Sequence, residues 1–266
     1  SRPVKSILDE AKKLIDAGAK EITLLGQNVN AWNANGSDDR VWGLGKLINE
    51  LAKIKELKFI RYMTSHPLDM DTELIEAHRD IEKLMPFLHL PVQSGSDNIL
   101  KLMNRKHKVS DYLKIIEKVR NYIPNIAISG DFIIGFPGET DKDHQKTLQL
   151  IREIEFSQAY SFKYSIRPGT PAAIFFDQVD EKIKNVRLQE VQNILREQQF
   201  QFNQKSINSD IKVLVLKNGK KDNQYLGRSP YNQSVFFNHE KENLIGSIVN
   251  VKVSEAYQNS LSGHIA

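Results

Sequence analysis

Short apolar runs alternate with segments of helical periodicity through the first 165 residues, and this alternation limits the possible folds more than any other feature. The runs lie at 21–25, 58–63, 87–90, 126–134 and 159–165. Between them apolar residues recur at helical spacing, as at Val4, Ala11 and Ile15. Strands that alternate with helices form right-handed units in a parallel sheet. The sequence therefore predicts an α/β fold of the (β/α) barrel type.

The fourth run, 126–134, contains a charged residue, Asp131. A carboxylate within a buried strand is costly unless another group pairs with it. Near the carboxyl end of such a strand a polar side chain usually faces a ligand, which makes Asp131 a candidate site residue. The alternative is a plain core strand followed by a helix whose start is capped by Thr140 and Asp143.

Polar residues follow each of the five runs, whereas the loops that enter the runs, such as 16–20, are plain. The carboxyl ends of the strands carry the chemistry of a (β/α) barrel, so these loops are expected to surround one site. We expect the Asp131 carboxylate to lie there, within reach of Gln93, Ser94 and His66. The alternative is that Gly and Pro are simply turn residues. That alternative leaves five side chains unexplained: Gln27, Asn28, His66, Gln93 and Asp131.

The pattern changes after a long polar helix expected over 180–205. Strand-length runs without intervening helices follow, at 211–216, 224–228, 233–237, 247–254 and 260–265. They predict a small antiparallel β-barrel over 206–266. Such barrels often bind nucleic acid through aromatic and basic side chains, here Tyr225, Arg228 and Tyr231. Phe236 and Phe237 are two further candidates for such contacts. The alternative is that these adjacent residues alternate and that one of the two lies in the barrel core.

The composition excludes several classes of protein. With 40% hydrophobic and 26% charged residues the chain is ordinary globular material. It has neither an apolar run long enough for a membrane span nor a secretory start, which predicts a cytoplasmic location. There is no cysteine, so we expect neither disulfides nor thiolate metal ligands. The net charge of +4 indicates a slight preference for polyanions.

Six motifs occur in order: 24–31 (LLGQNVNA), 61–67 (RYMTSHP), 89–96 (HLPVQSGS), 103–105 (MNR), 131–140 (DFIIGFPGET) and 164–171 (YSIRPGTP). Together they resemble the radical S-adenosylmethionine (SAM) methylthiotransferases, and most closely the tRNA-2-methylthio-N(6)-dimethylallyladenosine synthases. The resemblance covers nearly the whole chain. It implies a partial (β/α) radical SAM barrel over 1–179, a connecting helix over 180–205 and a TRAM-like RNA-binding barrel over 206–266.

The resemblance implies a reaction: radical methylthiolation of C2 of N(6)-dimethylallyladenosine next to the anticodon of tRNA. The implied cofactors are SAM and two 4Fe–4S clusters, and the implied partner is the tRNA anticodon stem-loop. The family binds its clusters through a CxxxCxxC loop after the first barrel strand and three cysteines of an N-terminal domain. This chain begins at Ser1 and has none of these cysteines. We therefore expect a fragment without the first strand and that domain, inactive and free of iron by itself.

The resemblance also implies SAM contacts at the strand ends. The matching residues are Gln27, Asn28, Ser65, His66, Gln93, Ser94, Asp131, Gly135 and Arg167. Gln27 stands where the superfamily usually has an acid, and Glu139 lies one place later than the usual fifth-strand pattern. Two helix arginines, Arg105 and Arg120, are further candidates for the SAM carboxylate or a phosphate.

Two other functions remain open. A sister methylthiotransferase that acts on threonylcarbamoyladenosine or on a ribosomal protein would share the fold and cofactor. The motifs 27–30 and 64–67 favour the dimethylallyl enzyme. From a different class, the chain is also consistent with a cysteine-free paralogue that only binds RNA, although the absence of an initiator Met argues against it.

Overall fold

The computed structural model describes residues 1–240 and 243–266. Its first part is an open sheet of parallel strands, in chain order across the sheet. The strands are β1 (Glu21–Leu24), β4 (Phe59–Tyr62), β5 (Phe87–His89), β6 (Ala127–Ile134) and β7 (Gln158–Lys163). A bridge between Ile60 and Leu84 connects β4 to the segment that leads into β5. All five predicted strands are confirmed, and so is the partial barrel with parallel strands.

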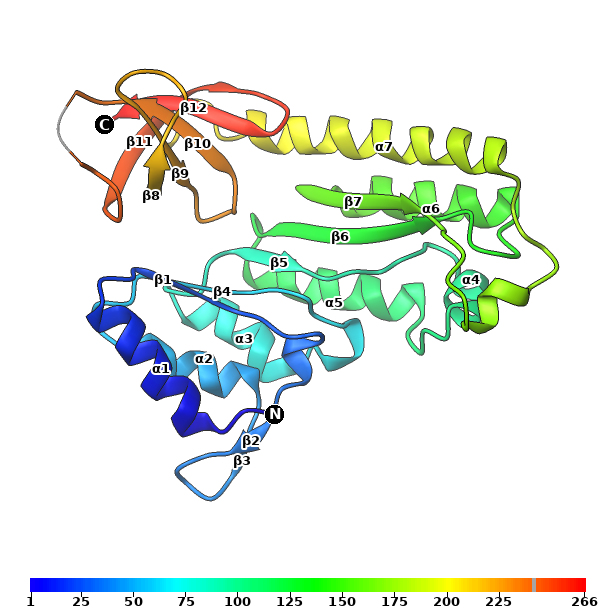
Figure 1. Cartoon of the computed structure of the whole chain (residues 1–266), viewed down its shortest axis with the longest axis horizontal. Coiled ribbons are helices and arrows are strands. Elements are labelled where there is room, and N and C mark those ends of the chain that lie inside the picture. Colours follow the sequence, from blue (N-terminus) through cyan, green and yellow to red (C-terminus); the bar gives the residue numbers. More distant parts are fainter. Residues whose placement is uncertain (241–242) are drawn as a thin grey trace.

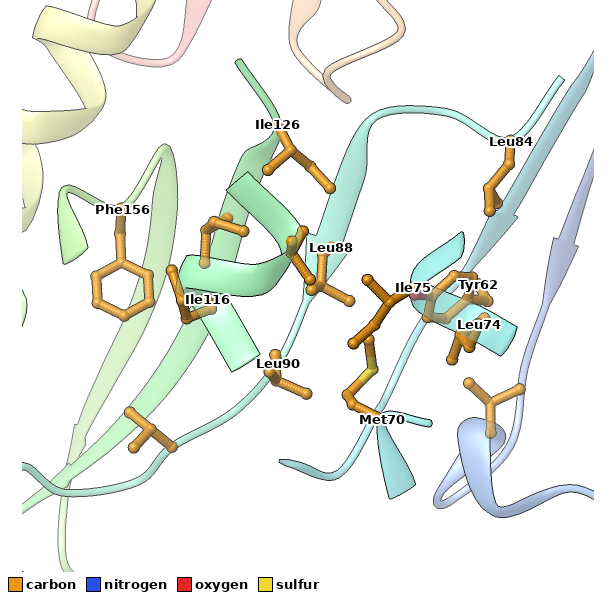
Figure 2. Packing of buried hydrophobic residues seen from close by; sticks show 14 of the residues in the cluster. Tyr62, Met70, Leu74, Ile75, Leu84, Leu88, Leu90, Ile116, Ile126 and Phe156 are labelled. Atoms are coloured by element: carbon orange, nitrogen blue, oxygen red, sulfur yellow. The ribbon is translucent and has the colours of Figure 1, made fainter. Parts of the chain in front are cut away.

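Helices cover one face of this sheet (Figure 1). They are α1 (Val4–Asp16), α2 (Leu44–Ala52), α3 (Thr72–Asp80), α4 (Asp97–Leu102), α5 (Val109–Tyr122), α6 (Asp141–Ile154) and α7 (Glu181–Gln204). Alternate strand residues, such as Ile128 and Phe132, pack against them in one apolar core. Figure 2 shows Tyr62 and Leu88 in this core beside Ile75 and Ile116 from helices α3 and α5.

The other strand residues point away from the helices, because successive side chains along a strand face opposite sides. We call this side the open face, and it carries Arg61, His89, Asp131, Tyr160 and Phe162. Lys163 shows the orientation of β7, since its ammonium contacts α7 through Glu181 at 3.0 Å. Tyr160 and Phe162, at odd spacing from Lys163, therefore face the opposite way.

Several short elements were not predicted. They are the hairpin strands β2 (Ala34–Asn35) and β3 (Val41–Trp42) and the 3-10 helices Val29–Ala31, Pro67–Asp69 and Pro171–Ile174. The hairpin depends on one side chain: the Trp42 Nε1 donates to Asp38 Oδ1 at 2.6 Å. A Cβ at Gly36 would lie 2.0 Å from the same Trp42 nitrogen, so only glycine fits there.

The C-terminal part is a closed barrel with the strand order β10-β12-β11-β8-β9 (Figure 1). The strands are β8 (Asp210–Asn218), β9 (Gln224–Arg228), β10 (Ser234–Asn238), β11 (Ile248–Ala256) and β12 (Ser260–Ile265). The barrel closes through a parallel pair, β10 with β12, and its other pairs are antiparallel as predicted. Phe237 lies in the core and Phe236 is only half-buried, which confirms the expected alternation.

The barrel docks at the end of the sheet where the strands start (Figure 1). Phe59 of β4 and Met85 before β5 pack against Leu214 of β8. The Arg61 side chain bonds to the backbone of the loop 229–230, so this loop reaches the open face. None of the helices within 1–240 and 243–266 is long and apolar enough to span a bilayer.

Candidate active site

Three neighbouring strands are each followed by a residue in the left-handed backbone conformation. Thr64 follows β4 with a φ of 64°, Gln93 follows β5 with 76°, and Gly135 follows β6 with 71°. For a threonine or a glutamine this conformation costs about 1–3 kcal/mol, and such residues cluster at binding sites. The mouth of the sheet, meaning the loops after β1, β4, β5 and β6, is therefore the candidate site.

Asn30 holds the loop after β4 in place. Its Oδ1 accepts a hydrogen bond from the His66 backbone N–H at 2.8 Å, and its Nδ2 donates to the His66 carbonyl at 2.9 Å. Close by, Asn28 Nδ2 donates to Asp69 Oδ2 at 2.6 Å. These bonds join the loop after β1 to the loop after β4, which brings the predicted site residues Asn28 and His66 onto neighbouring loops. Asn30 was not among the predicted site residues, although it lies in the quoted motif 24–31.

Two buried oxygens at this mouth have no hydrogen-bond partner within the described ranges, Asn28 Oδ1 and Ser65 Oγ. A buried polar atom left unpaired costs about 1–3 kcal/mol. A ligand that donates hydrogen bonds at the mouth would remove this cost. Both residues were predicted site residues.

Two histidine rings and an arginine interact with one another near the loop after β4. The rings of His66 and His107 meet edge to face, with centroids 5.5 Å apart. Burial lowers the pKa of the His66 imidazole below its usual value, and the charge of Arg105 lowers it further. Burial also lowers the pKa of His107, so both rings are neutral at pH 7. The charge of Asp131 acts on Arg105, which places this predicted arginine within electrostatic range of the site.

Asp131 lies on the open face as predicted, but with a different partner. Its Oδ2 is 3.6 Å from His89 Nε2, and 28% of its side chain is exposed. The His89 Nδ1 in turn lies 3.0 Å from Ser129 Oγ. The expected position within reach of Gln93, Ser94 and His66 stays a prediction, because the side-chain partner given for the Asp131 carboxylate is His89. Gln93 reaches Asp131 only through its backbone N–H, which donates to the Asp131 carbonyl at 2.9 Å.

The reason is the register of the sheet. His89 pairs with Ser129 across β5 and β6, and paired residues of parallel strands point to the same side. Asp131 is two residues beyond Ser129 and so shares that side. His89 stands in a quoted motif, and the signal that would have identified it is a polar residue at the last position but one of the apolar run 87–90.

The Ser94 hydroxyl points toward α6. Its Oγ lies 3.4 Å from Thr147 Oγ1 on α6 and accepts a hydrogen bond from the Ser96 N–H at 3.2 Å. Gly95 permits this close packing, because a Cβ there would lie 2.6 Å from Thr147 Cα. The Ser94 hydroxyl is thus used against the helix layer. The capping of α6 by Thr140 and Asp143, in contrast, is confirmed.

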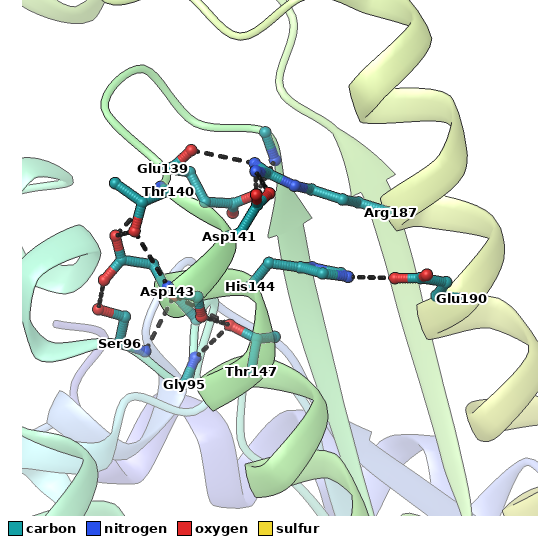
Figure 3. Close-up of polar contacts among 12 residues, drawn as sticks. Gly95, Ser96, Glu139, Thr140, Asp141, Asp143, His144, Thr147, Arg187 and Glu190 are labelled. Atoms are coloured by element: carbon teal, nitrogen blue, oxygen red, sulfur yellow. Dashed lines mark hydrogen bonds and ion pairs between the residues drawn. The ribbon is translucent and has the colours of Figure 1, made fainter.

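Gly135 is positioned by a buried ion pair (Figure 3). Its N–H donates to Glu139 Oε1 at 3.1 Å, and Arg187 Nη1 of α7 lies 2.9 Å from the same oxygen. Burial raises the pKa of the Glu139 carboxyl, while the Gly135 N–H and Arg187 oppose that rise. Geometry favours the ionised carboxylate, because both partners are donors. Glu139 therefore braces the turn at Gly135.

Gln27 is exposed at the mouth, on the loop after β1, and Arg167 is exposed on the loop after β7. Arg120, by contrast, lies at the opposite end of the sheet, where its guanidinium donates to the Ile154 carbonyl at the end of α6. The suggestion that Arg120 meets the SAM carboxylate was therefore wrong, whereas its contact with a phosphate stays a prediction. No group of three or more metal-ligating side chains occurs in the part of the chain that the structure describes.

Comparison with known families decides the identity of the larger part. The family description "Radical SAM superfamily" matches residues 1–151, more than half of the chain. The chain belongs to the radical SAM superfamily. A second family, the TRAM domain, matches residues 204–266, which form the end of α7 and the closed barrel.

Two solved radical SAM structures are similar to this chain, and the first of them shares its fold. The methyltransferase TsrM from Kitasatospora setae, solved with cobalamin and a 4Fe–4S cluster bound, has a TM-score of 0.51 at 14% identity over 65% of this chain. Coproporphyrinogen III oxidase from Escherichia coli has a TM-score of 0.49 at 14% identity over 84% of this chain. The present chain covers 33% of the length of TsrM and 61% of the length of coproporphyrinogen III oxidase.

The residues at the mouth fit SAM, whose ammonium and hydroxyl groups are hydrogen-bond donors. Asn28 Oδ1 and Ser65 Oγ are the unpaired oxygens that could accept from them. An iron–sulfur cluster, however, is held by thiolates. This radical SAM chain has no cysteine, so its residues do not fit a cluster.

Tyr225, Arg228 and Tyr231, which were predicted to bind RNA, each contact another side chain of the protein. Tyr225 is 7% exposed and its ring stacks on Phe237 with centroids 5.7 Å apart. A ring in the barrel core cannot stack on a base, so that prediction was wrong. Arg228 lies 3.4 Å from Glu21 of β1, and the Tyr231 ring packs on Phe202 of α7. Contacts of Arg228 and Tyr231 with RNA stay predictions.

Proposed function

We propose that the chain is part of a tRNA-modifying methylthiotransferase that acts at C2 of N(6)-dimethylallyladenosine next to the anticodon, in the cytoplasm. The observation that carries this proposal is the docking of a TRAM barrel onto a radical SAM sheet through a buried arginine, Arg61. An RNA held by the barrel would lie on the same rigid unit as the mouth. The functional units would be 1–179, 180–205 and 206–266.

We assign the SAM site to the mouth. Asn28, Ser65 and His66 would accept hydrogen bonds from the ligand, and Gln93 and Gly135 would line the site at their left-handed turns. When bound, SAM would supply the methyl group and the radical precursor. Gln27 and Arg167, exposed on the rim, are proposed contacts for its polar end or for the target nucleotide.

The remaining residues have positioning roles. Asn30 fixes the His66 backbone with two hydrogen bonds. His89 orients the Asp131 carboxylate on the open face. Ser94, which faces α6, would contribute only through its backbone. Two 4Fe–4S clusters would be bound by segments of the parent protein that carry cysteines.

The test is nucleoside analysis of tRNA treated with the full-length parent protein, reconstituted with iron and sulfide and supplied with SAM and a reductant. We expect a methylthio group on dimethylallyladenosine in the anticodon stem-loop and none on threonylcarbamoyladenosine or ribosomal protein. Asn30→Ala should reduce turnover strongly, because it frees the His66 loop. Asn33→Ala, in an exposed loop nearby, is the matched control and should leave turnover unchanged. Product on either of the other two substrates alone would contradict the proposal.

A further inference from the structure

Two aromatic rings lie exposed on the open face of β7. Tyr160 is 47% exposed and Phe162 is 59% exposed. Their orientation follows from their neighbours on the strand: Ala159 packs against the helix-side core, and Lys163 contacts α7 through Glu181 and Asn185. Residues two apart on one face of a strand are about 7 Å from each other. The rings thus form a continuous aromatic surface.

The surroundings of this surface are partly polar. Tyr160 pairs in register with Asp131 of β6, and Phe162 pairs with Ile133. Gln158 Nε2 donates to the Tyr160 hydroxyl at 2.7 Å, which holds that ring in position. A carboxylate therefore adjoins one ring and an apolar side chain adjoins the other.

The position of the surface is also informative. The TRAM loop 229–230 reaches the same open face through Arg61, at the start of the strands. The SAM site proposed above lies at the other end, at the mouth. The aromatic surface is on the sheet between the two. The aromatic residues predicted on the barrel are used internally, since Tyr225 is in its core and Tyr231 packs on Phe202.

We infer that Tyr160 and Phe162 form a stacking surface for an unpaired adenine base of the RNA substrate. This inference rests on the proposed function. Aromatic side chains bind splayed-out bases of RNA loops by stacking. The Asp131 carboxylate can accept a hydrogen bond from the N–H group of the base, and an apolar N(6) substituent can lie against Ile133. An apolar peptide is a poorer fit, because Asp131 and Gln158 flank the rings.

The test measures RNA binding, which requires neither a cluster nor turnover. A labelled anticodon stem-loop hairpin is titrated with this chain by fluorescence anisotropy, with either adenine or an abasic site next to the anticodon. Because a base gains affinity by stacking on an aromatic ring, wild-type protein should prefer the adenine hairpin roughly tenfold. Phe162→Ala should reduce this preference to about onefold to twofold by the same reasoning. Phe162→Leu, which keeps an apolar side chain but has no aromatic face, should do the same with an unchanged melting temperature.

Tyr257→Ala is the matched control, because Tyr257 is an exposed aromatic residue, 50% exposed, just beyond β11 of the barrel. It should leave the preference for adenine over the abasic site unchanged, whatever it does to overall affinity. If Phe162→Ala and Phe162→Leu keep the wild-type preference, or if wild-type protein shows none, the stacking inference is overturned while RNA binding stands. If no hairpin binds at all, the proposed tRNA function is overturned and the inference with it.

Discussion

Arg61 of β4 donates a 2.7 Å hydrogen bond to the carbonyl of Ser229, which lies 168 residues further along the chain. The same guanidinium donates to the Pro230 carbonyl at 2.8 Å and pairs with Glu21 Oε2 at 2.9 Å. Its side chain is only 3% exposed. One buried cation therefore joins two strands of the sheet to the TRAM barrel.

Arg61→Ala should lower the free energy of unfolding by about 3 kcal/mol, since it leaves two carbonyls without their donor and Glu21 without its buried ionic partner. Chemical denaturation of this chain measures the effect. Arg228→Ala is the control, because Arg228 meets the same Glu21 at 3.4 Å but is 39% exposed. An ion pair of this kind contributes at most about 1 kcal/mol. Equal losses in the two variants would show that the buried geometry of Arg61 is unimportant.

The sequence was sufficient to predict the elements of the fold. Strand length and helical spacing are local properties, so the five parallel strands, the seven helices and the small barrel were all recognised. The hairpin at Ala34–Asn35 and Val41–Trp42 was missed because two-residue strands carry no periodicity. The parallel pairing of β10 with β12 depends on which strands become neighbours in the folded barrel. No local sequence pattern indicates this.

The site was predicted less completely, for the same reason. Residues at strand ends were identified, but which side they face depends on register and on loop geometry. His89 meets Asp131 because β5 and β6 align His89 with Ser129. Ser94, one residue beyond Gln93, turns toward α6 after the left-handed conformation at Gln93. In the barrel, the pattern could not distinguish an inward Tyr225 from an exposed one.

The buried histidine of α3 predicts a pH dependence of stability. His78 lies in the core with its Nε2 2.6 Å from the Tyr62 hydroxyl, and burial lowers its pKa to about 4. An unfolded histidine has a pKa of about 6.5, so the unfolded chain binds more protons between these values. Stability from this group should be complete above about pH 6.5 and should fall by about 3 kcal/mol toward pH 4.

Denaturant titrations between these pH values test this expectation with a variant pair. His78→Gln should be less stable at neutral pH and should show a shallower loss on acidification. His264→Gln, at an exposed position on β12, should keep the wild-type dependence. His66, His107 and His144 also have lowered pKa values and add to the wild-type slope with the same sign. Identical pH slopes for all three proteins would contradict the role of His78.

Asp131→Asn tests the open face. The substitution keeps the shape of the side chain and removes the charge that attracts His89 and Arg105. Because the carboxylate is partly exposed, we expect a change in unfolding free energy below about 1 kcal/mol. In the full-length parent, SAM affinity or turnover should fall several-fold. Asp16→Asn, at the end of α1, is the control and should change neither. A lower melting temperature with unchanged SAM affinity would instead identify Asp131 as a structural brace.

Reconstitution with iron and sulfide tests the expectation that this chain binds no 4Fe–4S cluster. This chain has no cysteine, and non-thiolate side chains do not replace the thiolates of a 4Fe–4S cluster. Anaerobic treatment with iron and sulfide should therefore give no stoichiometric cluster absorbance. The full-length parent, treated in parallel, is the positive control. Metal analysis with about four irons per molecule of this chain would contradict the prediction, since cluster binding by this family uses cysteine ligands.

The TRAM barrel should contribute salt-dependent affinity for tRNA. Deleting it is a poor test, because Arg61 would be left without both carbonyl partners, and Phe59 and Met85 without Leu214. A substitution of surface charge avoids this damage. Lys220 and Lys221 are exposed in the turn between β8 and β9. Removing one lysine–phosphate interaction should reduce the slope of log affinity against log salt by about 0.7–0.9.

The double variant Lys220→Gln, Lys221→Gln is compared with Lys12→Gln, Lys13→Gln, an equally charged and exposed pair on α1. Affinity for the tRNA is measured at several salt concentrations. The barrel variant should bind more weakly at low salt and have a slope smaller by about 1–2 units, because one or two lysines no longer release counterions from phosphates. The α1 variant should keep the wild-type slope, since α1 lies at the far side of the sheet from the barrel (Figure 1). If both pairs change the slope equally, the attraction comes from net charge and the barrel turn has no particular part in it.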